Sequence, residues 1–156
     1  MTEDQPTYRV SALQHGTVID HLEPGTALTA FQVLGVPRDA LVTIGMNLHS
    51  AKSGSKDIIK IDGIELTRDQ VAKIALLSPN ATISIIRDYA VVDKVEVALP
   101  QVIEDIVRCP NPSCVTNADA IRTRFDLAGI DPIRLRCHWC ERLVRVDELV
   151  FGPPAL

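Results

Sequence analysis

The first hundred residues alternate between strand-like and helix-like patterns of apolar positions. The clearest pattern lies at residues 42–48, where Val, Ile, Met and Leu alternate with Thr, Gly and Asn. A period of two is typical of a strand that buries one face. Shorter patterns of the same kind predict strands at residues 8–13 with a flanking stretch at 17–21, at 57–61, at 82–87 and at 89–99.

Two helices are predicted between these strands. The first begins near Thr26 and carries Leu28, Phe31 and Leu34 at helical spacing. The second begins with a Thr-x-x-Gln capping box at residues 67–70, in which the two side chains satisfy each other's free backbone donors. The small, polar segment between the second and third strands, at 49–55, indicates a mobile loop.

The predicted order is therefore strand, helix, strand, strand, helix, strand, strand. This is a split βαβ, ferredoxin-like arrangement with one extra strand, and its helices should cover one face of an antiparallel sheet. Beyond Pro100 only short strands are predicted, at 121–125, 133–137 and 143–146. The predicted fold class is α+β, with an N-terminal ferredoxin-like antiparallel sheet, two helices and a small all-β domain.

Composition supports two domains, 1–100 and 101–156. All four cysteines and seven arginines, but no lysine, lie in the second part. Across the 156 residues, 46% are hydrophobic and 23% charged, which excludes intrinsic disorder. The net charge of −4 weighs against a nucleic-acid-binding domain. With no long apolar run and an acidic N-terminal stretch, we expect no membrane span, no secretory signal and a cytoplasmic location.

The cysteines follow the spacing C-x4-C, then 22 residues, then C-x2-C. Two such turns can direct four sulfurs into one space and complete a tetrahedral thiolate shell. Soft sulfur ligands favour zinc or an iron–sulfur cluster, although ferredoxin spacing places three cysteines close together. Four reduced core cysteines are the remaining alternative. We predict one structural Zn2+ per chain, bound by Cys109, Cys114, Cys137 and Cys140.

Polar residues within apolar strands offer a weaker signal. Lys60 and Lys94 each interrupt an apolar strand, which usually means only that they lie on its solvated face. On neighbouring strands they could instead contact phosphate oxygens, with Asp20 accepting from a ribose hydroxyl. There is no Gly-rich phosphate loop and no catalytic constellation, so the sequence predicts a binding module without an enzyme activity of its own.

Seven short stretches together resemble the regulatory chain of aspartate carbamoyltransferase over essentially the whole length. They are GTVIDH at 16–21, TIGMNL at 43–48, KDIIKI at 56–61, PNAT at 79–82, DYAVVDK at 88–94, CPNPSC at 109–114 and CHWCE at 137–141. The resemblance implies an N-terminal allosteric domain that binds nucleotides and a C-terminal zinc domain that docks on the catalytic chain. It also implies regulatory homodimers that bridge two catalytic trimers and control pyrimidine biosynthesis in response to CTP, ATP and UTP.

Site residues follow from the resemblance by position. Asp20, Lys60 and Lys94 match the polar nucleotide contacts. The same pocket is lined by Val10, Ser11, Leu13, His21, Ser84, Ile86, Tyr89 and Val91, with backbone groups near Leu13, Ile86 and Tyr89 reading the base edge.

This chain departs from the better-known bacterial members at two of these positions and at Asp93, the neighbour of a third. Ser11 stands in place of Glu and Ser84 in place of Asn, while Asp93 replaces a small neutral residue. We expect the Asp93 carboxylate to weaken triphosphate binding, since it lies next to Lys94 in the sequence.

In the C-terminal domain, the resemblance implies that Asn111 and Glu141 contact the catalytic chain. Ser113 replaces an Asn of the same surface, and Arg142 adds a positive charge that suits an acidic partner. Coupling is expected to pass through residues 100–108, the covalent connection between the domains. The alternative function is a zinc-ribbon adaptor that binds nucleic acid or a transcription complex.

Overall fold

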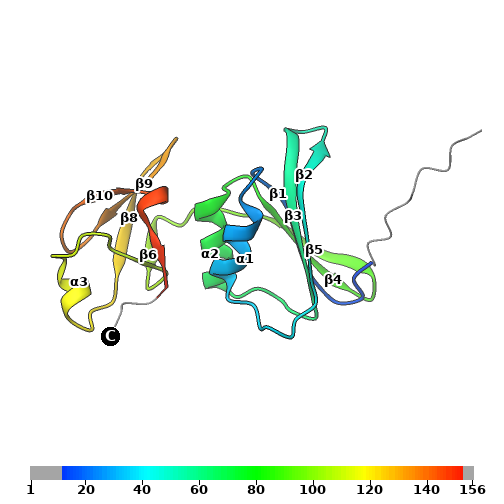
Figure 1. Cartoon of the computed structure of the whole chain (residues 1–156), viewed down its shortest axis with the longest axis horizontal. Coiled ribbons are helices and arrows are strands. Elements are labelled where there is room, and N and C mark those ends of the chain that lie inside the picture. The colour runs from blue at the N-terminus through cyan, green and yellow to red at the C-terminus, as the bar shows by residue number, and fades with distance from the viewer. Residues whose placement is uncertain (1–11, 153–156) are drawn as a thin grey trace, which may run out of the picture.

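The computed structural model describes residues 12–152, which form an N-terminal lobe up to Pro100 and a C-terminal lobe from Gln101 (Figure 1). In the N-terminal lobe the sheet has the strand order β2-β3-β1-β4-β5, and each neighbouring pair is antiparallel. This is the predicted ferredoxin-like arrangement with one extra strand at the edge. Its elements are β1 (Gly16–Leu22), α1 (Ala27–Leu34), β2 (Val42–Ser50), β3 (Gly54–Asp62), α2 (Arg68–Leu77), β4 (Thr82–Arg87) and β5 (Ala90–Glu96). The strand predicted at 8–13 lies largely outside the described residues.

Both helices cover the same face of the sheet. Ile19 of β1 is in register with Ile59 of β3 and Ile83 of β4, and all three side chains are buried under the helices. Because side chains alternate between the faces of a strand, Val18 and its cross-strand partners point to the opposite face. Figure 1 shows α1 and α2 between the sheet and the C-terminal lobe, so this open face points away from that lobe.

Helix α1 buries Leu34 and packs Phe31 against the core as the sequence predicts, but Leu28 does not share that face. Ala27, Ala30 and Leu34 are buried, whereas Leu28 is 55% exposed. The small alanine side chains let the helix lie close to the sheet, which turns Leu28 outwards. Gly35 ends the helix in the left-handed conformation, with φ of 61°.

Helix α2 begins and ends as predicted. The Thr67 hydroxyl accepts from the Gln70 N–H at 3.2 Å, and the Gln70 side chain accepts from the Thr67 N–H at 2.9 Å. The helix ends at Leu77, two residues before Pro79.

The sequence predicts a loop at 49–55, but the structure shows the end of a hairpin there. His49 pairs with Ser55 and Ser50 pairs with Gly54, so β2 and β3 continue almost to the turn. Polar side chains are compatible with this extension because both faces of the hairpin end are largely solvated.

The C-terminal lobe holds a four-stranded sheet of order β10-β9-β8-β6 and a two-stranded ribbon of β11 and β7. The strand predicted at 133–137 is confirmed, whereas the one at 121–125 is misplaced: β8 begins at Arg124 and continues through Gly129 to Ile130. Pairing with β9 holds this segment extended although Ala128 and Gly129 are weak strand formers. The elements are β6 (Val102–Glu104), β7 (Val107–Arg108), α3 (Val115–Ala118), β8 (Arg124–Ile130), β9 (Ile133–Cys137), β10 (Leu143–Arg145) and β11 (Val150–Phe151), with a 3-10 turn at Val146–Glu148.

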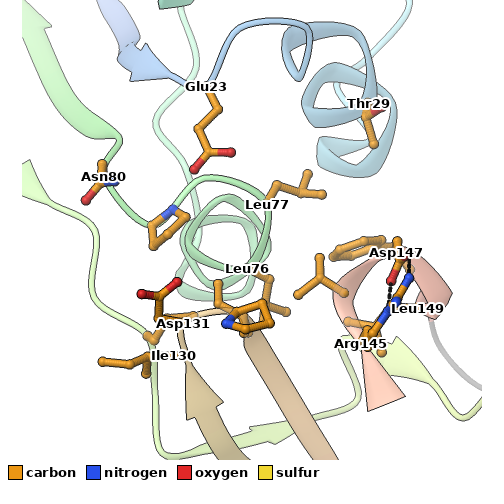
Figure 2. A pocket seen from close by; sticks show the side chains of 16 residues that line it. Glu23, Thr29, Leu76, Leu77, Asn80, Ile130, Asp131, Arg145, Asp147 and Leu149 are labelled. Atoms are coloured by element: carbon orange, nitrogen blue, oxygen red, sulfur yellow. Dashed lines mark hydrogen bonds and ion pairs between the residues drawn. The ribbon is translucent and has the colours of Figure 1, made fainter. Parts of the chain in front are cut away.

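The two lobes contact each other through α2. Leu76 is 1% exposed and belongs to the apolar cluster of the C-terminal lobe, together with Ile103, Ile106 and Phe125. Beside this contact lies a groove of about 1160 Å³, lined by residues of both lobes. Figure 2 shows Leu76 and Leu77 of α2 at its centre, with the ion-paired Arg145 and Asp147 at one side.

Candidate functional site: a cysteine metal centre and an open sheet face

The four cysteines converge in the C-terminal lobe. Cys109 follows β7, Cys114 precedes α3, Cys137 ends β9 and Cys140 lies in the turn before β10. All four sulfur atoms lie within 4.8 Å of one another, with 3.6 Å between Cys109 and Cys140 and 3.8 Å between Cys114 and Cys137. Metal–sulfur bonds of about 2.3 Å in a tetrahedron require sulfur separations of roughly 3.8 Å. The donor set therefore fits a tetrahedral thiolate-bound metal ion.

Hydrogen bonds fix the two cysteine turns. In the first turn, the Asn117 amide donates to the carbonyls of Cys109 and Asn111, both at 2.8 Å. In the second, the Glu141 N–H donates to the Cys137 carbonyl at 2.9 Å, and Glu141 takes the left-handed conformation with φ of 62°. Both turns are thus formed by the protein's own contacts.

Burial affects the protonation of the cysteine thiols, and with it the binding of a metal ion. Burial raises the pKa of the Cys109 thiol and of the Cys137 thiol. Burial acts in the same direction on Cys140, but hydrogen bonds from the Arg142 backbone and the Asn111 side chain outweigh it and lower its pKa to about 7. A metal ion that binds four thiolates must displace the protons, so affinity falls as the pH falls. Four protein ligands leave no open position, which is typical of a structural site.

Lys60, Ser84 and Lys94 lie in one cross-strand row on the open face. Lys60 pairs with Val18, Val18 with Ser84, and Ser84 with Lys94. The prediction that the two lysines lie on neighbouring strands is wrong, because β1 and β4 separate β3 from β5. Three strand spacings put their backbones roughly 14 Å apart, so the lysines flank the row instead of meeting in it.

Asp20 and His21 lie at an irregularity of β1. The register with β3 shifts between Ile19 and Leu22, and His21 has φ of 57°, so the regular alternation ends at Asp20, which still pairs with Thr82 of β4. Lys56 contacts both oxygens of the Asp20 carboxylate, at 2.8 and 2.9 Å. Burial raises the pKa of Asp20, but the hydrogen bonds from Lys56 and the His21 N–H outweigh it, and the pKa lies below its ordinary value.

Lys56 is the residue of this face that the sequence reasoning missed. It precedes Lys60 by four residues on β3, and an even spacing puts both on one face of a strand. This spacing of four residues could have indicated in the sequence that Lys56 shares the face of Lys60.

The remaining pocket residues lie near the turn between β4 and β5. Ile86 pairs with Val91, and Tyr89 is 66% exposed with φ of 63°. The Tyr89 N–H donates to the Gln14 carbonyl at 3.1 Å, which brings the segment around the half-buried Leu13 to this turn. The Tyr89 N–H is therefore engaged within the chain in this structure. Val10 and Ser11 lie outside the described residues.

The Asp93 side chain does not lie beside that of Lys94, although the adjacency of the two residues in the sequence suggests it. It pairs with Ile85, whose side chain is on the helix-covered side, whereas Lys94 pairs with Ser84 on the open face. The two side chains of β5 thus point to opposite faces, because Asp93 and Lys94 are consecutive in a strand.

The four predicted interface residues cluster around the metal centre. Asn111 and Ser113 lie in the first cysteine turn, where the Ser113 N–H donates to the Asn111 side chain at 3.0 Å. Glu141 and Arg142 follow Cys140, and the Arg142 guanidinium lies 3.6 Å from the Glu148 carboxylate. Arg142 therefore already has an acidic partner within the chain.

Comparison with known proteins identifies the family. The profile described as aspartate carbamoyltransferase regulatory chain, allosteric domain, matches residues 8–98, and the profile described as its metal binding domain matches residues 101–150. The chain belongs to the family of aspartate carbamoyltransferase regulatory chains. Among its relatives of that name, the protein of Methanothermobacter thermautotrophicus is 45% identical over 143 residues, which cover 90% of this chain and 92% of the relative. That of Pyrococcus abyssi is 44% identical over 145 residues, which cover 91% of this chain and 95% of the relative.

Membership confirms the resemblance on which the sequence predictions rest. The chain is a non-catalytic subunit with an allosteric and a metal-binding domain, and its partner is the catalytic chain of aspartate carbamoyltransferase. The alternative of a zinc-ribbon adaptor is not supported. Among the described residues, no helix is long and apolar enough to cross a membrane.

Proposed function

We propose that this chain binds the nucleoside triphosphates CTP, ATP and UTP on the open sheet face of domain 1–100. Through domain 101–156 it controls the catalytic trimers of aspartate carbamoyltransferase, and so pyrimidine biosynthesis. The observation that carries the proposal is the row of Lys60, Ser84 and Lys94, on a face that no helix of residues 12–152 covers.

The chemistry of the row suits a triphosphate ester. Ammonium groups at both ends of the row form charge-assisted hydrogen bonds with phosphate or ribose oxygens. The exposed Tyr89 and Val91, beside Ile86, supply apolar surface for a base at the end of the sheet. Asp20 and His21 complete the polar side, with Lys56 holding the Asp20 carboxylate in place.

Zinc is the proposed metal. The sulfur separations match a tetrahedral site, and a closed shell of four thiolates suits a cation without redox chemistry. When bound, zinc supplies folding energy to a lobe that is small for independent stability. The reducing conditions of the cytosol, the proposed location, keep the thiols available.

Two protein contacts belong to the proposal. The edge strand β2 offers unpaired backbone groups and the exposed side chains of Met46 and Leu48, and the exposed Leu41 precedes it; these suit self-pairing into the regulatory homodimer. Docking on the catalytic chain is assigned to Asn111, Ser113, Glu141 and Arg142, which surround the metal centre.

The test is reconstitution of the holoenzyme from this chain and its catalytic trimers. Titration with CTP, ATP and UTP should change the aspartate saturation curve, whereas isolated trimers should not respond. A coupling of about 1–3 kcal/mol corresponds to a five- to 150-fold change in affinity for the effector between the two quaternary states. Calorimetry in which the full chain binds none of the three nucleotides would refute the proposal.

A further inference from the structure

The four sulfur atoms differ in the hydrogen bonds that they accept. Backbone N–H groups favour the thiolate form at three of the four sulfur atoms: that of Asn111 at Cys109, those of Trp139 and Cys140 at Cys137, and that of Arg142 at Cys140. Such bonds stabilise thiolates and orient them towards the metal.

Cys114 stands apart from the other three. It is the residue before α3, a position from which a side chain usually accepts a backbone N–H of the first helical turn. Its sulfur accepts no such bond.

The Thr116 hydroxyl supplies a hydrogen bond to the Cys114 sulfur in place of a backbone N–H. Thr116 Oγ1 lies 3.2 Å from Cys114 Sγ, and both residues are only 1% exposed. A metal-bound thiolate has no proton to give, so the hydroxyl must be the donor. The neighbouring Asn117 binds two carbonyls of the cysteine turn and thereby keeps α3, and the Thr116 side chain with it, beside the sulfur.

We propose that Thr116 is a positioning residue of the metal centre, whose hydroxyl donates to the Cys114 thiolate and keeps that sulfur bound to the metal. Without this bond, Cys114 is the ligand from which the metal dissociates first. The inference rests on the proposed zinc site and extends it to a residue that does not itself bind the metal.

The test compares two substitutions in the full chain, Thr116→Val, which removes the hydroxyl at nearly constant shape, and Thr116→Ser, which retains it. Thr123→Val is a matched control, because Thr123 is a threonine of the same lobe, equally buried, whose hydroxyl has no partner among the described residues. Zinc affinity is measured by competition with a chromogenic chelator, and zinc release by the rate at which the chelator takes it up.

We expect Thr116→Val to weaken zinc binding roughly 10- to 100-fold and to speed release, while Thr116→Ser and Thr123→Val remain near the parent chain. In the cobalt-substituted proteins, the sulfur-to-metal charge-transfer band should move to longer wavelength only in Thr116→Val, because a thiolate without its donor is a stronger electron donor.

Each other outcome overturns the inference. Unchanged affinity and spectrum in Thr116→Val would show that the hydroxyl has no role. Equal losses in Thr116→Ser and Thr116→Val would assign the effect to shape. A parent chain that binds no zinc would refute the proposed zinc site itself, and the role of Thr116 with it.

Discussion

Leu76 of α2 and Ile103 of β6 lie in one buried cluster, although they belong to different lobes. Each is 1% exposed, so this cluster excludes water from the contact between the lobes. The helix that covers the N-terminal sheet is therefore also part of the core of the C-terminal lobe.

Leu76→Ala should loosen this contact. Removing a buried leucine side chain costs about 2–5 kcal/mol, and here the loss falls on the junction of the lobes. We expect the lobes to unfold at separate urea concentrations and the effector titration of the holoenzyme to flatten. Leu28→Ala, on the exposed side of α1, is the control and should change neither.

Cys114→Ser should remove the metal and unfold the C-terminal lobe, because three thiolates leave the tetrahedral shell incomplete. Metal analysis should find zinc in the parent chain and little in the variant, and the variant should not join catalytic trimers. Ser113→Ala, on the exposed side of the same turn, should retain the metal. Full assembly by Cys114→Ser would contradict a structural role.

Lys94→Ala should weaken nucleotide binding about ten- to a hundredfold, since a hydrogen bond to a charged group contributes roughly 1.5–3 kcal/mol. Calorimetry on the full chain measures this directly. Lys73→Ala removes a lysine from α2, under the opposite face of the sheet, and should leave the affinity unchanged. An equal loss in both variants would mean that net charge, and not the row of Lys60 and Lys94, attracts the nucleotide.

Asp93→Asn distinguishes the sequence prediction from the structure. If the carboxylate lay beside Lys94, its removal would strengthen triphosphate binding. Because its side chain points to the helix-covered side of β5, we expect an affinity close to that of the parent chain. Markedly tighter binding by the variant in calorimetry would contradict the register of β4 and β5.

Asp57→Asn should destabilise the N-terminal lobe. The buried Asp57 carboxylate accepts from the backbone N–H groups of Gly25, Ala27 and Asn47, at 2.9, 3.1 and 2.9 Å. An amide presents only one acceptor atom, so at least one buried N–H loses its partner at a cost of about 1–3 kcal/mol. Urea denaturation measures the change, and the exposed Asp39→Asn should have little effect.

The α/β order of the N-terminal lobe could be predicted because each local signal agrees with the tertiary structure. The period of two at 42–48 and the capping box of Thr67 and Gln70 lie where the sheet and α2 require them. Where local strand preference conflicts with strand pairing, the prediction from sequence is wrong. Gly129 is a weak strand former but lies in β8, because it pairs with β9.

The metal centre was predictable from spacing alone, since two short turns leave few ways to arrange four sulfurs. The open face was harder, because register decides which side chains share it. Strand order put Lys60 and Lys94 three strands apart, and consecutive positions put Asp93 on the other face; neither follows from one strand considered alone.

The expected route of coupling through residues 100–108 stays a prediction, to which the structure adds a contact through space. A covalent connection can be identified in the sequence, but a contact through space cannot. Ile103 within that segment is a core residue, whereas its neighbour Val102 is 38% exposed, so substitutions at these two positions should have different effects. Leu76 supplies the second connection.

The groove beside α2 leaves room for the two lobes to move about their contact. The C-terminal lobe packs against the helix at Leu76, and a groove of about 1160 Å³ lies between the lobes next to that point. Packed interiors resist deformation, but a solvent-filled gap closes or widens by expelling or admitting water. A tilt of one lobe against the other therefore leaves both the sheet and the cysteine cluster intact, and rotation between subunits can be absorbed within a single chain.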